Sequence, residues 1–238
     1  MPVWEVITES SNLGTARIAK MIGPEKQREF LSSLGFSKPT TIEMIEANGG
    51  KPLLPKRWNE LETMTISYGH GLSATPLHLA TGYATLANGG RLVNPTLLQE
   101  VKPVLGPRVI SKDVAKNSLA MLRGVVTGGT ASLADVDGYF VGGKTGTADK
   151  PSAQGGYDKE KNITNFASIF PINEPKYVLV VTLDEAQDTS GPEPKRTAGW
   201  TAVPVSAEII ARVAPLLGLR PKFDNHSTIG ITLSNWQE

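Results

Sequence analysis

The stretch VGGKTGTADK, residues 141–150, places one lysine, Lys144, among three glycines and two threonines. Aliphatic and aromatic residues precede it, which favours a buried strand leading into the stretch. Its glycines have no side chain that could block a close backbone approach, so an extended peptide could lie along this strand. The ammonium of Lys144 and the hydroxyls of Thr145 and Thr147 could hold a carboxylate. The stretch therefore predicts a peptide-binding strand, with a glycine-rich hairpin that exposes a lysine as the plain structural alternative.

A phosphate-binding loop is a rival interpretation of any glycine-rich stretch that contains Gly-Lys-Thr. We set it aside because a phosphate-binding loop joins a strand to a following helix, whereas Lys144 is expected within a strand. Substrate binding along a strand edge remains the favoured interpretation.

The order of patterns along the chain predicts an α+β fold. The most regular early helix has Thr75 as its N-cap, Pro76 at its first position and Gly89 just beyond its end. Residues 38–66 read as a long irregular connection. Strand-like runs cover residues 138–145, 165–172 and 176–186, joined by polar connections that suit antiparallel neighbours, and a last helical pattern follows. Helices packed on a mostly antiparallel sheet are therefore expected.

Composition excludes several classes of function. The 238 residues carry 24 Lys and Arg against 23 Asp and Glu, a formal net charge of +1, which predicts no nucleic acid partner. The chain has no cysteine, which excludes a thiol nucleophile and a disulfide framework. Neither a metal-ligand cluster nor a dinucleotide fingerprint is visible, so we expect no metal and no cofactor.

A second motif stands near the start of the chain. Ser10, Ser11 and Asn12 form an S-x-N triplet at the entrance of an expected helix, 134 positions before Lys144. Alone, such a triplet is most simply an N-cap cluster. An S-x-N triplet followed at long range by K-T-G on a strand is two thirds of the motif set of penicillin-interacting serine acyl enzymes.

Further stretches extend this resemblance in the same order along the chain. They are SYGHGLSATPLHLATGYATLANGG, VVTGGTA, ASIFPINEPKYVLVVTLDEA and TAVPVSAEIIARVAPLLGL. The chain resembles the C-terminal part of the transpeptidase domain of class B penicillin-binding proteins, most of all the division-specific type of Gram-negative bacteria. The resemblance implies the penicillin-binding and serine β-lactamase-like fold over residues 1–220 and leaves residues 221–238 as an appended tail.

The resemblance implies a proton-relay group formed by the S-x-N triplet and the lysine. Ser10 would pass protons to and from the nucleophile and the leaving amine, and Asn12 would hold the peptide group of the substrate. Lys144 would support the relay with a lowered pKa.

The resemblance also implies a carboxylate site on the strand. Thr145, Gly146 and Thr147 would receive the terminal carboxylate of a D-alanyl-D-alanine stem peptide or of a β-lactam. The backbone N–H of Thr147 would contribute to an oxyanion hole. The implied activity is peptidoglycan D,D-transpeptidation in septal cell-wall synthesis, with stem peptides, β-lactams and division-complex proteins as partners.

One motif of the family is missing from the sequence. No serine has a lysine three positions later, so the S-x-x-K that supplies the acylated serine is absent from the 238 residues. In the family it lies upstream of S-x-N, and only nine residues precede Ser10. We therefore expect a fragment that cannot acylate itself and needs the N-terminal half of the same protein. The intact protein would be anchored at the periplasmic face of the inner membrane.

Two alternatives stay open at this point. A related fold without the nucleophile could act as a sensor module that binds peptidoglycan or β-lactams. A serine β-lactamase shares the fold and two motifs, but it needs a deacylation base that we cannot assign in residues 38–66 or elsewhere.

Overall fold

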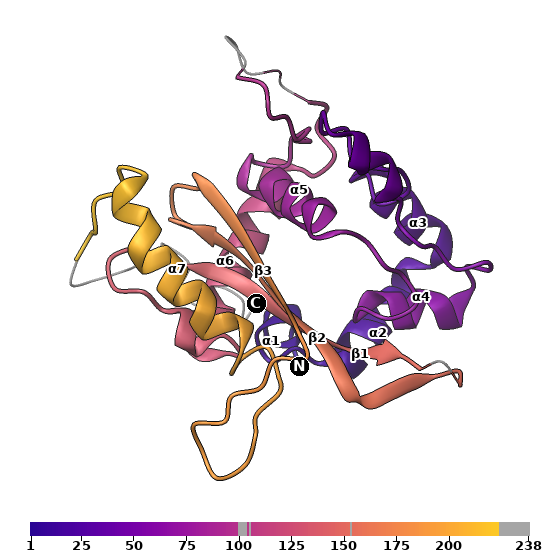
Figure 1. The fold of residues 1–238 in the computed structure, drawn as a ribbon. Coiled ribbons are helices and arrows are strands. Elements are labelled where there is room, and N and C mark those ends of the chain that lie inside the picture. Colours follow the sequence, from indigo (N-terminus) through magenta and orange to yellow (C-terminus); the bar gives the residue numbers. More distant parts are fainter. Residues whose placement is uncertain (100–103, 105, 153, 224–238) are drawn as a thin grey trace.

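The computed structural model describes residues 1–99, 104, 106–152 and 154–223. Helices come first, a three-stranded antiparallel meander follows, and one helix ends the order, which confirms the predicted α+β class (Figure 1). The elements are α1 (Val3–Thr8), α2 (Asn12–Ile22), α3 (Pro24–Ser33), η1 (Ile45–Gly49), α4 (Glu60–Ser67), α5 (Pro76–Ala87), α6 (Lys112–Gly128), η2 (Ser132–Ala134), β1 (Gly142–Pro151), β2 (Tyr157–Phe170), β3 (Tyr177–Asp184) and α7 (Ala202–Leu216).

The sheet has the order β1-β2-β3, so β1 is an edge strand within the described part of the chain. Lys144 lies opposite Ala167 and Thr147 opposite Thr164 in the β1–β2 register. Because side chains alternate between the faces of a strand, Lys144 and Gly146 belong to one face and the two threonines to the other. Gly146 therefore leaves the Lys144 face open next to the lysine, and Thr145 and Thr147 lie on either side of this glycine along the strand.

Helices cover both faces of the sheet (Figure 1). On one face, α7 and the second half of α6 build the larger core, whose fully buried side chains include Val125, Phe166 and Ile210. On the other face, a smaller cluster combines Leu122 of α6 with Ile169 and Ile172, and side chains of α5 pack against it. Helix α6 contributes side chains to both clusters and also contacts β1 directly.

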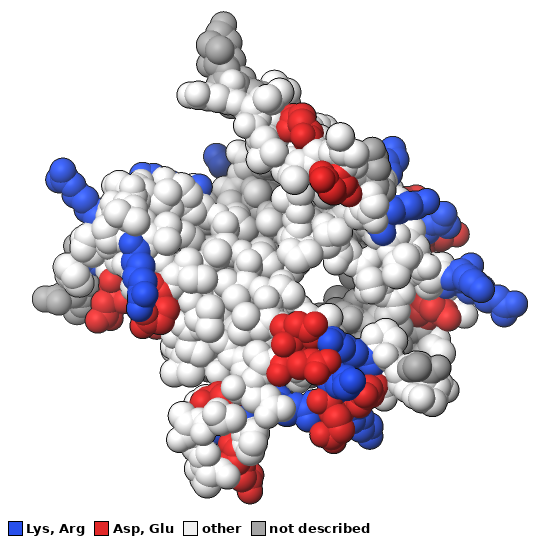
Figure 2. Space-filling model, in the orientation of Figure 1, with Lys and Arg blue, Asp and Glu red and all other residues white. Residues whose placement is uncertain are grey.

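Helices α2, α3 and α4 pack on one another and stand beside this body (Figure 1). Figure 2 shows the surface hollowed between the two parts, with a cluster of charged residues of both signs beside the hollow and others toward the outer edges. Among the described helices, none has the length and apolar character required to cross a bilayer.

The expected irregular connection over residues 38–66 is wrong at its end, because Glu60–Ser67 is a helix. The Oδ1 atom of Asn59 accepts hydrogen bonds from the N–H groups of Leu61 and Glu62, and the Glu62 carboxylate accepts one from the Asn59 N–H. This capping box compensates for a helix with few periodic apolar residues. The N-x-x-E signature was present in the sequence.

The predicted strands are confirmed in type but not in extent. Strand β1 begins at Gly142 and runs to Pro151, so the K-T-G triplet lies in its first half and not at its end. Strand β2 starts at Tyr157, eight residues before the sequence indicated. Of the predicted tail, residues 224–238 lie outside the described part, so the boundary between residues 220 and 221 stays a prediction.

Candidate active site

Ser10 lies in the tight turn that joins α1 to α2 and has a positive φ of 55°. Ser11, the next residue, caps α2 by accepting a hydrogen bond from the Gly14 N–H at 3.1 Å. A Cβ atom at Gly14 would lie 2.6 Å from a methyl group of Val6, so only glycine lets the two helices approach this closely. A left-handed conformation is costly for serine, and such outliers cluster at functional sites.

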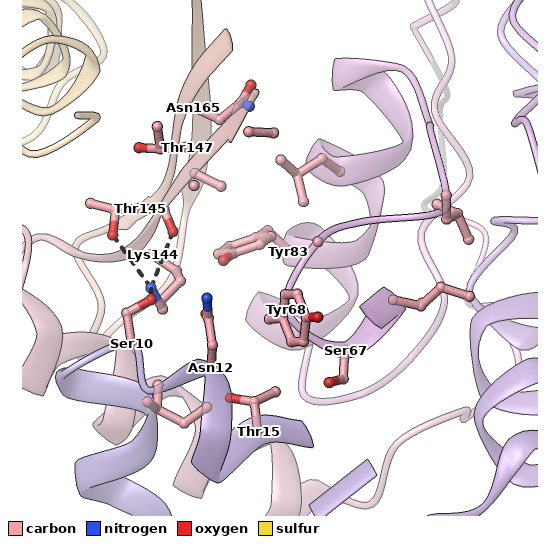
Figure 3. Close-up of a pocket in the computed structure, with 18 of the residues that line it drawn as sticks. Ser10, Asn12, Thr15, Ser67, Tyr68, Tyr83, Lys144, Thr145, Thr147 and Asn165 are labelled. Atoms are coloured by element: carbon pink, nitrogen blue, oxygen red, sulfur yellow. Dashed lines mark hydrogen bonds between the residues drawn. The ribbon is translucent and has the colours of Figure 1, made fainter. Parts of the chain in front are cut away.

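Lys144 reaches across from β1 to this turn (Figure 3). Its Nζ atom donates hydrogen bonds to Ser10 Oγ at 2.7 Å, to the Thr145 carbonyl oxygen at 3.1 Å and to Thr145 Oγ1 at 3.3 Å. Burial lowers the pKa of the Lys144 ammonium from its ordinary value of 10.5 to about 8. The lysine can therefore hold or release a proton close to neutral pH.

The two threonines that follow point to different partners. Thr145 Oγ1 lies 2.8 Å from Thr130 Oγ1, which comes from the turn after α6. Thr147 Oγ1 accepts a hydrogen bond from the Ala198 N–H at 3.0 Å. Because a hydroxyl keeps its own proton when it accepts, Thr147 can still donate to a ligand.

The glycines of the stretch do not all serve the purpose that the sequence indicated. A Cβ at Gly142 would lie 2.0 Å from Ile172 Cδ1, and one at Gly143 would lie 2.5 Å from the Ala167 carbonyl oxygen. Both glycines therefore allow close packing inside the protein and not the approach of a peptide. Only Gly146 is open, since its nearest neighbour, Asn165 Cβ, lies 3.8 Å away.

These residues meet at one pocket of about 550 Å³. All six candidate residues of the sequence analysis line it, and Asn12 and Lys144 point toward the same space in Figure 3. Tyr83 from α5 lies on the opposite wall, where burial raises the pKa of its hydroxyl. Apolar side chains form much of the rest of the wall, among them Ile7, Leu31, Phe36, Ile66, Leu72, Leu79 and Leu122.

Three aromatic rings connect the helical group to the β1–β2 hairpin beside this pocket. The ring centroids of Tyr68 and His70 lie 5.6 Å apart, and those of His70 and Tyr157 lie 5.2 Å apart with an edge-to-face geometry. Tyr68 itself lines the pocket. Through these ring contacts, the start of β2 packs against the segment after α4.

The sequence spacing alone does not dismiss a phosphate-binding loop, because Gly138, Gly143, Lys144 and Thr145 match its pattern of Gly, four residues and Gly-Lys-Thr. The local structure does dismiss it. Lys144 lies within β1, which continues to Pro151, whereas the loop requires a helix to begin at the lysine. The Lys144 ammonium also faces Ser10 and not a cradle of backbone N–H groups.

Sequence reasoning missed Thr130 and Tyr83 as members of the site. Thr130 belongs to VVTGGTA and Tyr83 to the helix after Thr75, both of which were recognised only as stretches of similarity. No local pattern could link either residue to Lys144, because the links exist only after packing. Within the described residues, no group of three or more His, Asp or Glu side chains could hold a metal ion.

An α+β domain in which S-x-N and K-T-G triplets meet at the edge strand of an antiparallel sheet has the architecture of the penicillin-interacting acyl enzymes. Residues 1–210 match the model of the penicillin-binding protein transpeptidase domain family. The chain belongs to this family, which confirms the resemblance and the fold inferred from the motifs.

Several relatives share most of this chain. A probable peptidoglycan D,D-transpeptidase FtsI from Caulobacter vibrioides is 34% identical over 92% of the chain, and peptidoglycan D,D-transpeptidase FtsI from Escherichia coli K12 is 31% identical over 91%. The chain spans only 38% and 36% of these two proteins, respectively.

Solved structures agree with the sequence relatives. The transpeptidase domain of penicillin-binding protein 3 from Burkholderia pseudomallei superposes with a TM-score of 0.83 at 34% identity, over 93% of this chain and 66% of that one. Penicillin-binding protein 3 from Mycobacterium tuberculosis, complexed with aztreonam, gives 0.78 at 27% identity, over 92% of this chain and 52% of that one.

Proposed function

We propose that this chain contributes the S-x-N and K-T-G half of the active site of a serine-type peptidoglycan D,D-transpeptidase that cross-links stem peptides in septal cell-wall synthesis. One observation carries the proposal. Lys144 Nζ lies 2.7 Å from Ser10 Oγ across 134 positions of sequence, within a pocket that also contains Asn12 and the two threonines. The names of the relatives support the same activity.

The nucleophile of the proposed reaction comes from outside these 238 residues, because the sequence contains no S-x-x-K. The relatives are long enough to supply it, since the chain spans 38% of the Caulobacter protein. In this proposal, residues 1–220 are the C-terminal portion of the transpeptidase domain, residues 221–238 are a tail, and the chain alone is inactive. The N-terminal half of the same protein is then its first partner.

The proposed chemistry is acyl transfer in two steps. The nucleophilic serine attacks the carbonyl carbon between the two D-alanines, a new C–O bond forms, the C–N bond breaks, and the terminal D-alanine leaves with a proton. An amine of a second stem peptide then attacks the ester, loses a proton and releases the serine. β-Lactams imitate the first step, but their leaving nitrogen stays attached to the acyl group.

In this proposal the residues of the chain hold the substrate and move the protons. Ser10 donates the proton that the departing amine needs, and Lys144, with its pKa near 8, restores it. Asn12 holds the peptide group. Thr145 and Thr147 receive the terminal carboxylate where Gly146 leaves the strand open, and the Thr147 N–H faces the developing oxyanion.

The proposed location is the periplasmic face of the inner membrane, with division proteins as neighbours of the intact enzyme. The proposal rests on the division-related names of the relatives, since the described part of the chain contains no helix that could serve as an anchor.

The test is covalent labelling by a fluorescent penicillin. We would compare the 238-residue chain with a version continued upstream in the same reading frame through an S-x-x-K, on denaturing gels and by intact mass. The proposal expects an adduct on the extended protein alone, lost in Lys144→Ala and kept in Lys150→Ala. Lys150 is a matched control because it lies on the same strand but pairs with Asp184 and Glu185.

Three outcomes would contradict the proposal. An adduct on the 238-residue chain would mean that one of its own residues is the nucleophile. Reversible binding with no adduct on either protein would favour a sensor module, and rapid hydrolysis of the penicillin by the extended protein would favour a β-lactamase.

A further inference from the structure

Thr145 is the centre of a hydrogen-bonded chain that joins three separate segments of the protein. Ser10 Oγ, Lys144 Nζ and Thr145 Oγ1 are linked at 2.7 Å and 3.3 Å, and Thr145 Oγ1 continues to Thr130 Oγ1 at 2.8 Å. Ser10 belongs to the S-x-N triplet, and Lys144 and Thr145 belong to the K-T-G triplet. Thr130 belongs to neither triplet and has no role in the proposed acyl transfer.

Close backbone packing on two sides fixes the position of Thr130. A Cβ at Gly129 would lie 2.4 Å from the Thr8 carbonyl oxygen, and a Cβ at Gly199 would lie 2.9 Å from the carbonyl oxygen of Thr130. Ala131, the next residue, is fully buried. The Thr130 hydroxyl is therefore an exposed group on a turn that packing holds against α1 and against the segment before α7.

The capacity of a hydroxyl for hydrogen bonds decides what this contact can do. A threonine oxygen has two lone pairs and one proton. The protonated Lys144 ammonium donates and cannot accept, so it occupies one lone pair of Thr145. If Thr130 donates to the second lone pair, the proton of Thr145 has no remaining partner except a group in the pocket.

We propose that Thr130 is a positioning residue that donates to Thr145 and thereby aims the Thr145 hydroxyl proton at the carboxylate of the ligand. The inference rests on the proposed function, because it assumes that Thr145 binds that carboxylate. It extends the carboxylate site from two threonines on β1 to a third threonine on the turn after α6. It also makes the site selective for a ligand group that accepts a hydrogen bond over one that donates.

The test uses the 238-residue chain and two probes that differ at the carboxyl group. Benzylpenicillin carries an ionised carboxylate, whereas its methyl ester is neutral there and is the weaker hydrogen-bond acceptor. Saturation-transfer difference NMR measures reversible binding of each, so no nucleophile is needed. We expect Thr130→Val to reduce the preference for the acid over the ester by about 3- to 10-fold, the usual worth of one neutral hydrogen bond. Thr130→Ser should retain the preference.

A matched variant separates positioning from stability. Thr127 lies on the last turn of α6, is exposed and donates only to the Arg123 carbonyl oxygen, so Thr127→Val should leave the preference unchanged. An unchanged or increased preference in Thr130→Val would overturn the inference, because it would mean that Thr130 accepts the proton of Thr145 or does not affect it.

The variant Thr145→Val distinguishes this inference from its premise. If Thr145→Val loses the preference for the acid while Thr130→Val keeps it, the carboxylate site stands and the role of Thr130 is refuted. Two results would refute the premise itself. If the unaltered chain shows no preference for the acid, or if Thr145→Val keeps the full preference, Thr145 does not bind the carboxylate. The inference about Thr130 then fails with that assignment.

Discussion

Replacing Lys144 by methionine should change how the stability of the protein depends on pH. Methionine keeps an unbranched apolar side chain, one atom shorter than that of lysine, but cannot be protonated. In the native protein, burial lowers the pKa of Lys144 from 10.5 to about 8. Between these two values the unfolded chain binds more protons than the native one, so the free energy of unfolding rises with pH in that window. The methionine variant lacks this rise.

The size of the effect follows from the difference in pKa. Each pKa unit corresponds to about 1.4 kcal/mol, so the full difference would give about 3 kcal/mol between pH 7 and pH 11. Lys144 is not completely buried, and residual solvent screens part of the cost of its charge. We therefore expect the wild-type protein to gain about 1 to 2 kcal/mol relative to Lys144→Met from pH 7 to pH 10.

Urea denaturation of both proteins at several pH values would measure this difference directly. Titration of the other groups is common to both proteins and cancels in the comparison. Lys150→Met is the control, because Lys150 lies on the same strand but its pKa is raised by hydrogen bonds to Asp184 and Glu185. The free energy of unfolding of Lys150→Met, relative to wild type, should not fall between pH 7 and pH 10. A difference between wild type and Lys144→Met that stays constant from pH 7 to pH 10 would refute a buried, easily deprotonated Lys144.

Three further predictions concern the packing and the chemistry of the site. Gly142→Ala should lower the free energy of unfolding by about 1 to 3 kcal/mol, because its Cβ would overlap Ile172, whereas Gly146→Ala should lower it by less than about 1 kcal/mol. Urea denaturation of both variants compares the two losses, and equal losses would contradict the packing role of Gly142. Asn59→Ala should cost about 1 kcal/mol by the same measurement, since it removes the capping box of α4, and no loss would mean that tertiary contacts alone hold this helix. Ser10→Ala in the upstream-extended protein should slow penicillin labelling by about 100-fold or more with little change in thermal midpoint, and an unchanged rate would remove Ser10 from the proposed relay.

Local sequence patterns were sufficient for the elements whose ends are marked by strong signals. Thr75 accepts a hydrogen bond from the His78 N–H, Pro76 begins α5, and Gly89 follows the helix with a φ of 62°, as the sequence indicated. Ser111 likewise caps α6 through the Val114 N–H. These signals act within one helical turn, so they can be read without knowledge of the fold.

Patterns that depend on distant partners could not be read in this way. The glycines at 142 and 143 looked like an opening for a peptide, but their neighbours are Ile172 and Ala167, which only the sheet and α6 bring to them. Helix α4 has weak apolar periodicity, and its contacts with α2 and α3 exist only in the folded protein. The pairing of Ser10 with Lys144 came from the resemblance to a family and not from any periodicity in the chain.

The contact between Ser10 and Lys144 depends on two independent packing arrangements, and this has a consequence for the proposed reaction. Close packing of α1 on α2 at Gly14 sets the turn that carries Ser10, and close packing of β1 on α6 and β2 sets the position of Lys144. Neither arrangement involves a residue of an S-x-x-K. The hydrogen bond between the two side chains is therefore already formed in a chain that contains no S-x-x-K. A nucleophilic serine in the pocket would therefore meet a Ser10–Lys144 relay that is already organised. The proposed reaction would then not have to supply the free energy needed to assemble this relay.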